Sequence, residues 1–321
     1  MQYEFAPMEG ITDDIFRRLH HKYFPGVSRY YTPFLSPSEG RTFSKKELRE
    51  VLPEHNEGVP LVPQLLTNRC ELFLKGAKIL KDLGYEEVNL NLGCPSGTVT
   101  AKGKGSGFLF PERREQLEKF LDEIFARCPI AISIKTRLGK ADPEEFPALL
   151  ELYNRYPIKQ LILHPRVQQD FYRKPVRMEW FFWAMEHSAN PLCLSGGIST
   201  AADFHRVFSK TSPPQVIMLG RGLVADPGLA GKLQGSPAPS RETLRAFYEE
   251  LFQETAARLG TPKYTMFRMK ELWSYFILLF DQREKYQKLL RKTTSLTEYQ
   301  AITAHILRGL PLRDAAEPFW I

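Results

Sequence analysis

Long hydrophobic runs, paired cysteines and sequence repeats are all missing from this chain of 321 residues. No run approaches the roughly 18 apolar residues of a membrane helix, and the start, MQYEFAPMEG, has no basic segment followed by an apolar one. The composition, 43% hydrophobic and 25% charged, excludes collagen-like, disordered and disulfide-stapled proteins. Spacings of 24, 34 and 65 residues fit neither a zinc ribbon nor a redox pair for Cys70, Cys94, Cys128 and Cys193. We therefore expect a cytoplasmic globular protein with reduced cysteines, no membrane span and no metal site.

Eight short apolar segments recur between residues 3 and 219, each followed by a break and then a helical pattern. Their starts are 24 to 44 residues apart, the length of a strand, a turn, a helix and a second turn. This spacing predicts an α/β fold, a (β/α)₈ TIM barrel, and the 44-residue interval predicts a long loop at its catalytic face. The expected strands are Tyr3–Met8, Arg29–Pro33, Leu61–Leu65, Glu87–Asn91, Ala131–Thr136, Gln160–His164, Pro191–Leu194 and Gln215–Leu219.

The last 80 or so residues carry only helical patterns and follow the linker-like stretch QGSPAPS. We expect a barrel domain over 1–235 and a small all-α helical bundle over 240–321. Residues 258–292 hold nine Lys and Arg against three acids, a net charge of +6. Such a run is either a solvated helical face or a surface that binds a polyanion. The expected helices are Thr243–Leu259, Met266–Phe280, Lys285–Leu290 and Leu296–Gly309.

In a TIM barrel the carboxyl ends of the strands face the active site, so the residues there indicate its chemistry. Strands seven and eight end in the glycine-bearing turns LSGGIST and MLGRGL. Backbone N–H groups at such turns bind phosphate, and a phosphate site after strands seven and eight is common in barrels. The expected phosphate-binding residues are Ser195, Gly196, Gly197, Gly220 and Arg221.

Three further strand ends carry reactive side chains. Lys135 is placed to form a Schiff base, to stabilise an anionic reduced flavin, or to extend to a rim carboxylate. Gln64 suits the edge of a pyrimidine-like ring, or simply caps its strand. Cys94 lies in a loop rich in Gly and Lys two residues past a strand, where a thiol acts as an acid or a nucleophile. The other three cysteines are interpreted as small buried hydrophobes.

The sequence around Cys94 resembles the active-site signature of the tRNA-dihydrouridine synthases through Val88-Asn89-Leu90-Asn91-Leu92-Gly93-Cys94-Pro95, with Val99 and Gly105-Ser106 at their spacings. The opening strand and turn of that family are similar to residues 6–13, which include Pro7 and Met8. Its flavin-contacting elements match residues 135–139 and the two glycine turns. Its helical RNA-binding domain resembles the cluster Arg268, Lys270, Trp273 and Tyr275.

The resemblance implies an FMN-dependent enzyme that reduces the C5–C6 double bond of uridines in tRNA, with NADPH reducing the flavin. It implies that Cys94 is the general acid at C5 and that Asn91 hydrogen-bonds the uracil. The flavin would be held by Pro7, Met8, Gln64, Lys135, His164 and the two glycine turns, with Arg166 lining the same pocket. Expected RNA contacts are Lys102, Lys104, Arg268, Lys270, Lys285, Lys288 and Arg291. A monomer is the expected state.

The chain departs from the family pattern after the sixth strand. Where many members have His-Gly-Arg-Thr, it reads His164-Pro165-Arg166-Val167, and Ser195 stands where Asn is common. Other functions remain open at this point: a flavin dehydrogenase of a free pyrimidine, an aldolase using Lys135, or an RNA-binding protein without catalysis. The basic segment disfavours the first, and a retained loop cysteine disfavours the last.

Overall fold

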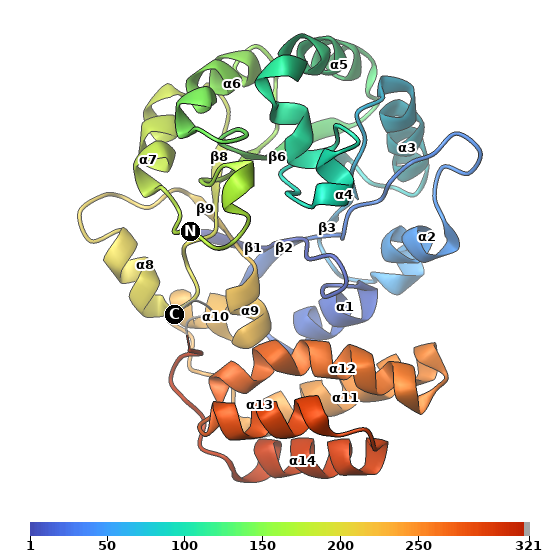
Figure 1. Ribbon diagram of the computed structural model, residues 1–321, viewed down its shortest axis with the longest axis vertical. Coiled ribbons are helices and arrows are strands. Elements are labelled where there is room, and N and C mark those ends of the chain that lie inside the picture. Colours follow the sequence, from blue (N-terminus) through green and yellow to red (C-terminus); the bar gives the residue numbers. More distant parts are fainter. Residues whose placement is uncertain (318–321) are drawn as a thin grey trace.

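Parallel strands form a ring that helices surround in the computed structural model, which describes residues 1–317 (Figure 1). The sheet order β3-β2-β1-β9-β8-β7-β6-β5-β4 places the two ends of the sheet on consecutive segments of chain, which closes the barrel. The TIM-barrel prediction is thereby confirmed. The strands are β1 Gln2–Phe5, β2 Val27–Tyr31, β3 Leu61–Val62, β4 Gln64–Leu65, β5 Glu87–Leu92, β6 Ala131–Arg137, β7 Leu161–His164, β8 Leu192–Ser195 and β9 Val216–Leu219.

The third predicted strand, residues 61–65, is two short strands rather than one. Pro63 separates them because proline has no N–H to donate to a neighbouring strand. On one side Tyr30 pairs with Leu61, and on the other Gln64 pairs with Asn89. The Pro63 carbonyl still accepts a hydrogen bond from the Asn89 N–H at 2.8 Å, so the barrel wall continues through the proline.

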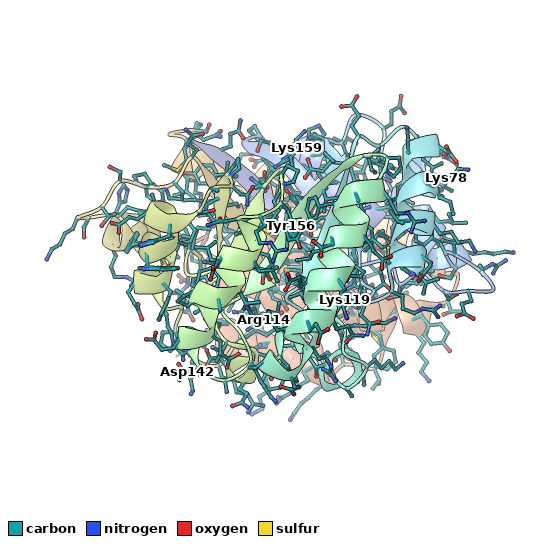
Figure 2. The ribbon with its side chains drawn as sticks, turned by 90° about the horizontal axis from the view of Figure 1, so that it is seen from above. Lys78, Arg114, Lys119, Asp142, Tyr156 and Lys159 are labelled. Atoms are coloured by element: carbon teal, nitrogen blue, oxygen red, sulfur yellow. The ribbon has the colours of Figure 1, made fainter. Side chains whose placement is uncertain are left out.

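Helices cover the outside of the ring and run back from the carboxyl end of the strands. In Figure 2, Arg114, the first residue of α5, and Asp142, which precedes α6, lie toward one end, and Lys159, which precedes β7, lies at the other. Among residues 1–317, no helix is long and apolar enough to cross a membrane. The helices of this part are α1 Asp14–Tyr23, α2 Lys45–Val51, α3 Cys70–Asp82, α4 Gly97–Thr100, α5 Arg114–Arg127, α6 Phe146–Tyr153, α7 Met178–His187, α8 Ala201–Val207, α9 Arg221–Ala225 and α10 Leu229–Leu233.

The barrel is closed at its amino end and open at its carboxyl end. Buried Glu4 pairs with Arg29 at 2.7 Å, and Arg29 also pairs with Glu87 at 2.8 Å and bonds Gln160 at 2.7 Å. These groups, together with Tyr31, which bonds Glu4 and Gln160, fill the amino end with a network of polar contacts. The long loop expected after the fourth strand unit is confirmed at the other end, where α4 and two 3₁₀ turns separate β5 from α5.

Four helices form the carboxyl-terminal part: α11 Arg241–Leu259, α12 Pro262–Phe276, α13 Arg283–Lys292 and α14 Leu296–Gly309. The predicted helix Met266–Phe280 has different bounds. Pro262, which lies before the predicted start at Met266, is the first residue of α12 and Thr261 caps it, because proline is favoured at a position whose N–H has no helical partner. The far end passes into a 3₁₀ turn at Ile277–Leu279. Residues 318–321 of the predicted second domain lie outside the described residues.

The helical part packs directly on the barrel through α11 and α12 (Figure 1). Phe16 of α1 lies 5.8 Å from Phe247 of α11 and 6.3 Å from Phe276 of α12, ring centre to ring centre. Around these rings Arg258 forms a two-pronged ion pair with Asp14, at 2.5 Å for each bond. The apolar contact and the ion pair hold the two parts in a fixed orientation.

Candidate active site

A cavity of about 420 Å³ opens at the carboxyl end of the barrel, a size typical of ligand sites. The strand ends, the turns that follow them and α12 form its wall. Thirteen predicted site residues line it: Pro7, Met8, Gln64, Asn91, Cys94, Lys135, His164, Arg166, Ser195, Gly196, Gly197, Gly220 and Arg221. The parallel strands bring these residues together because all of them point their carboxyl ends at the same opening.

Cys94 is held in a rigid loop at the edge of this cavity. The Asn91 Oδ1 atom accepts hydrogen bonds from the Gly93 and Cys94 N–H groups at 3.0 and 2.9 Å. The Cys94 carbonyl accepts from both the N–H and the hydroxyl of Ser106, at 3.1 and 2.9 Å. Gly105 lies between these contacts with a φ of +55°, and a Cβ there would approach the Cys94 carbonyl to 2.8 Å. The position therefore requires glycine.

Burial raises the pKa of the Cys94 thiol above its ordinary value. The side chain is half-buried, and the nearby cations Arg137 and Lys135 only partly offset the effect of burial. The thiol is therefore protonated at neutral pH. A protonated thiol is a proton donor, whereas a nucleophilic cysteine needs a lowered pKa.

Hydrogen bonds between side-chain amides of β4 and β5 support the same loop. Gln64 Nε2 donates to Asn89 Oδ1 at 2.7 Å, and Asn91 Nδ2 donates to Gln64 Oε1 at 2.7 Å. Asn89 in turn donates to the Ser133 hydroxyl at 2.9 Å. One donor hydrogen on Gln64 and one on Asn91 are left by these bonds, since each amide carries two. Both residues line the cavity.

Lys135 and Arg137 project from alternate positions of β6 and therefore share one side of the strand. Burial, and then the neighbouring Arg137 charge, lower the pKa of Lys135 to about 8. Arg137 donates to the carbonyls of Gly93 at 2.8 Å, Val167 at 3.1 Å and Phe171 at 2.9 Å. It thus ties the Cys94 loop to the loop after β7, a role that sequence analysis did not assign to it.

His164 is neutral and carries its proton on Nδ1. Its Nε2 atom lies 2.8 Å from Arg166 Nη1, and an arginine only donates, so Nε2 is the acceptor. Burial and the surrounding cations, Arg137 first, lower the pKa of His164 well below its ordinary range. Pro165, the departure from the family pattern, lies between the two and accepts a hydrogen bond from the Arg177 N–H at 2.8 Å.

The two glycines after β8 are fixed by their surroundings as well as by their backbone. Gly196 and Gly197 have φ values of +97° and +82°. A Cβ on Gly196 would lie 2.9 Å from the His164 ring, and one on Gly197 would lie 2.6 Å from Val176. Only glycine keeps this turn in place, with its backbone facing the cavity.

Tyr172, which sequence analysis missed, covers part of the cavity. Its ring faces the guanidinium groups of Arg137 and Arg221, each 5.1 Å from the ring centre. It lies in the irregular loop after β7, where no sequence pattern marks it. Glu9, Glu271 and Tyr275 also line the cavity. The last two belong to α12, so the helical part contributes to the pocket wall.

The predicted RNA contacts fall into two groups. Exposed Lys102 and half-buried Lys104 lie on the loop beyond Cys94, and burial followed by the charges of Lys102 and Arg69 lowers the pKa of Lys104. Lys285, Lys288 and Arg291 are exposed on α13.

Two predicted RNA contacts are instead engaged within the protein. Arg268 donates to the Gly10 carbonyl and to the Ile11 carbonyl, the latter at 2.7 Å, and pairs with Asp13 at 3.2 Å. Lys270 donates to the Thr293 carbonyl. Trp273, from the same cluster, is buried and packs in the core of the bundle.

The sequence matches the dihydrouridine synthase family, described as "Dihydrouridine synthase (Dus)", over residues 4–309. The chain belongs to this family. Similar curated proteins are named tRNA-dihydrouridine(16) synthase. That of Aquipseudomonas alcaligenes is 29% identical over 84% of this chain and 89% of the relative, and that of Pseudomonas putida is 28% identical over 84% and 86%. The enzyme of that name from Pseudomonas syringae pv. tomato is 30% identical over 73% and 74%.

Solved structures with the same barrel fold include histamine dehydrogenase from Rhizobium sp. 4-9 and morphinone reductase. The first superposes with a TM-score of 0.55 at 15% identity, over 73% of this chain and 45% of that one. The second superposes with a TM-score of 0.51 at 11% identity, over 75% and 87%. At this level of identity the likeness concerns the fold.

Proposed function

We propose that this member of the dihydrouridine synthase family uses FMN to reduce the C5–C6 double bond of uridine 16 in tRNA, with NADPH as the electron donor. The observation that carries the proposal is a single cavity holding a protonated thiol, Cys94, and a cluster of cations around a glycine turn. The position within tRNA follows from the names of the similar curated proteins. A soluble monomer in the cytoplasm is the corresponding working form.

FMN fits the residues that line the cavity. A phosphate needs cations and backbone N–H groups, and Arg166 and Arg221 lie in the wall beside the turn at Gly196 and Gly197. A side chain on either glycine would collide with His164 or Val176, so the turn keeps its backbone open to the cavity. The remaining amide hydrogen of Gln64 and the Lys135 ammonium suit the polar edge of a flavin ring.

When bound and reduced, FMN would supply the hydride that adds to C6 of the uracil. The Cys94 thiol then gives its proton to C5, which completes the addition of two hydrogens across the double bond. The raised pKa keeps this proton on sulfur until it is needed. Asn91 positions the uracil with its second amide hydrogen while its oxygen keeps the Cys94 loop in place.

A uridine within folded RNA must leave the base stack to enter this cavity, at a cost of a few kcal/mol. Contacts elsewhere on the RNA offset that cost. Lys102 and Lys104 beyond Cys94 and the exposed cations of α13 supply phosphate contacts. Arg268 and Lys270 hold the helical part together and onto the barrel, so their effect on RNA is through its orientation.

The test is the visible spectrum of the purified protein, followed without air as NADPH and then unmodified tRNA are added. The proposal predicts flavin bands that bleach with NADPH and return with tRNA, with dihydrouridine found at position 16. Return of the bands with free uridine or another small molecule, and not with tRNA, would show a small-molecule reductase instead. A protein that FMN does not reconstitute would contradict both.

A further inference from the structure

One group of exposed apolar side chains lies where α11 meets α12. Among the described residues, eight large hydrophobic side chains are exposed, and three of them lie at the corner between α11 and α12. They are Leu259, Tyr264 and Phe267, with 38%, 61% and 57% of their surface exposed. Tyr264 and Phe267 are one helical turn apart and both are exposed to solvent. Neighbouring exposed aromatic rings of this kind mark interaction sites.

These rings belong to a stripe of α12 that ends in the cavity. Tyr264, Glu271 and Tyr275 are seven and four residues apart, which places them on one face of the helix. Glu271 and Tyr275 line the cavity. Tyr264 is therefore about 10 Å along the same face from Glu271, at a rise of about 1.5 Å per residue.

Hydrogen bonds to the barrel hold α12 beside the opening of the cavity. Between the rings and the cavity, Arg268 donates to the Gly10 and Ile11 carbonyls of the turn that follows β1. Met8 and Glu9, just before that turn, line the cavity. Figure 1 shows α12 lying against the barrel, on the side of the bundle nearest to it. The rings are thus held at a fixed place beside the opening.

We infer that Tyr264 and Phe267 form a stacking platform for the unpaired bases next to the uridine that enters the cavity. Removing one base from a stack leaves its neighbours without a partner, and exposed aromatic rings bind such bases by stacking. The exposed ammonium of Lys263 is placed beside the rings to meet the RNA backbone. This inference rests on the proposed function, since the RNA must already bind at this mouth.

Stacking on a neutral ring gives affinity without releasing salt ions, and this separates the platform from the lysines. Tyr264→Ala and Phe267→Ala are each expected to weaken tRNA binding by roughly 5- to 150-fold with an unchanged salt slope. KM for tRNA should rise with kcat little changed. Tyr264→Phe and Phe267→Tyr keep the rings and should bind as the parent does. Met185→Ala, which removes an exposed apolar side chain from α7, is the matched control.

The experiment measures tRNA affinity of the flavin-loaded protein at several salt concentrations, with 2-aminopurine placed next to the target uridine. The inference predicts that its fluorescence is quenched by the parent and by the aromatic variants but not by the alanine variants. Parental affinity and quenching in both alanine variants, in an enzyme that still reduces tRNA, would overturn the platform alone. A change of oligomeric state in those variants would instead show a protein contact. A parent that neither binds nor reduces tRNA would contradict the proposed function itself.

Discussion

Replacing Arg137 with methionine tests how the Cys94 loop is held. The guanidinium group donates to three carbonyls from two loops, Gly93, Val167 and Phe171, and is almost completely buried. A buried polar group that loses its partner costs about 1–3 kcal/mol. Val167 keeps a contact from the Asp170 N–H, so two carbonyls lose their donor. The expected loss in the free energy of unfolding is therefore about 2–6 kcal/mol for the two groups.

The same substitution has an electrostatic consequence. Arg137 is the charged neighbour that lowers the pKa of Lys135, so its removal should raise that pKa above about 8. Urea denaturation measures the first effect, and titration of the lysine by NMR measures the second. Arg173→Met removes an exposed arginine from the adjoining turn and serves as the control. A free energy of unfolding within 0.5 kcal/mol or so of the parent, with an unchanged lysine pKa, would refute the reasoning.

Three further predictions follow from the site and its surface. Gly197→Ala should destabilise the protein by more than the ~1–2 kcal/mol that alanine costs in a left-handed backbone conformation, because its Cβ would lie 2.6 Å from Val176. Gly235→Ala is the control in the same thermal melts: Gly235 has a φ of +86° and no neighbouring atoms, so only the cost of the backbone conformation is expected. Binding of FMN to the apoprotein should weaken as pH rises through about 8, where Lys135 loses its charge, and Lys135→Arg should abolish that dependence; equal affinity from pH 6 to 9.5 in the parent would contradict it. When glutamine replaces all of Lys285, Lys288 and Arg291, the slope of log affinity for tRNA against log salt concentration should become shallower by about three, at ~0.9 per lost phosphate contact. An unaltered slope would show that the RNA binds a different surface.

The barrel was predictable because its signal is repeated. Strand-length apolar segments at regular intervals define the fold even when one is broken, as at Pro63. The proline alone did not reveal whether a strand would end there or continue beyond it. The predicted start of the next helix, at Met266, was wrong because the helix begins at Pro262. Proline begins a helix as readily as it ends one.

The part of the site formed by the strand ends was predictable for a geometric reason. Parallel strands place their carboxyl ends at one opening, so Asn91, Lys135 and His164 had to meet there. The part of the site formed by the loop after β7 and by α12 was not predictable in this way. Tyr172 comes from an irregular loop, and Tyr275 reaches the cavity only because α12 docks on the barrel.

The docking of the two parts also decides the role of Arg268. A basic residue within a basic segment favours an RNA contact on sequence grounds. Its carbonyl partners at Gly10 and Ile11 are more than 250 residues away in the chain, and no local pattern links them. Long-range contacts of this kind depend on the assembled fold.

The most direct test of the account is a single-turnover reaction of reduced, flavin-loaded protein with unmodified tRNA, comparing the parent with Cys94→Ala. The account predicts that the variant keeps its flavin and binds tRNA as the parent does. Its rate of dihydrouridine formation should fall about 10²- to 10⁴-fold, the usual effect of removing a general acid, which is the role proposed for this thiol. An unchanged rate would contradict the role of Cys94 and, with it, the proposed chemistry of the site.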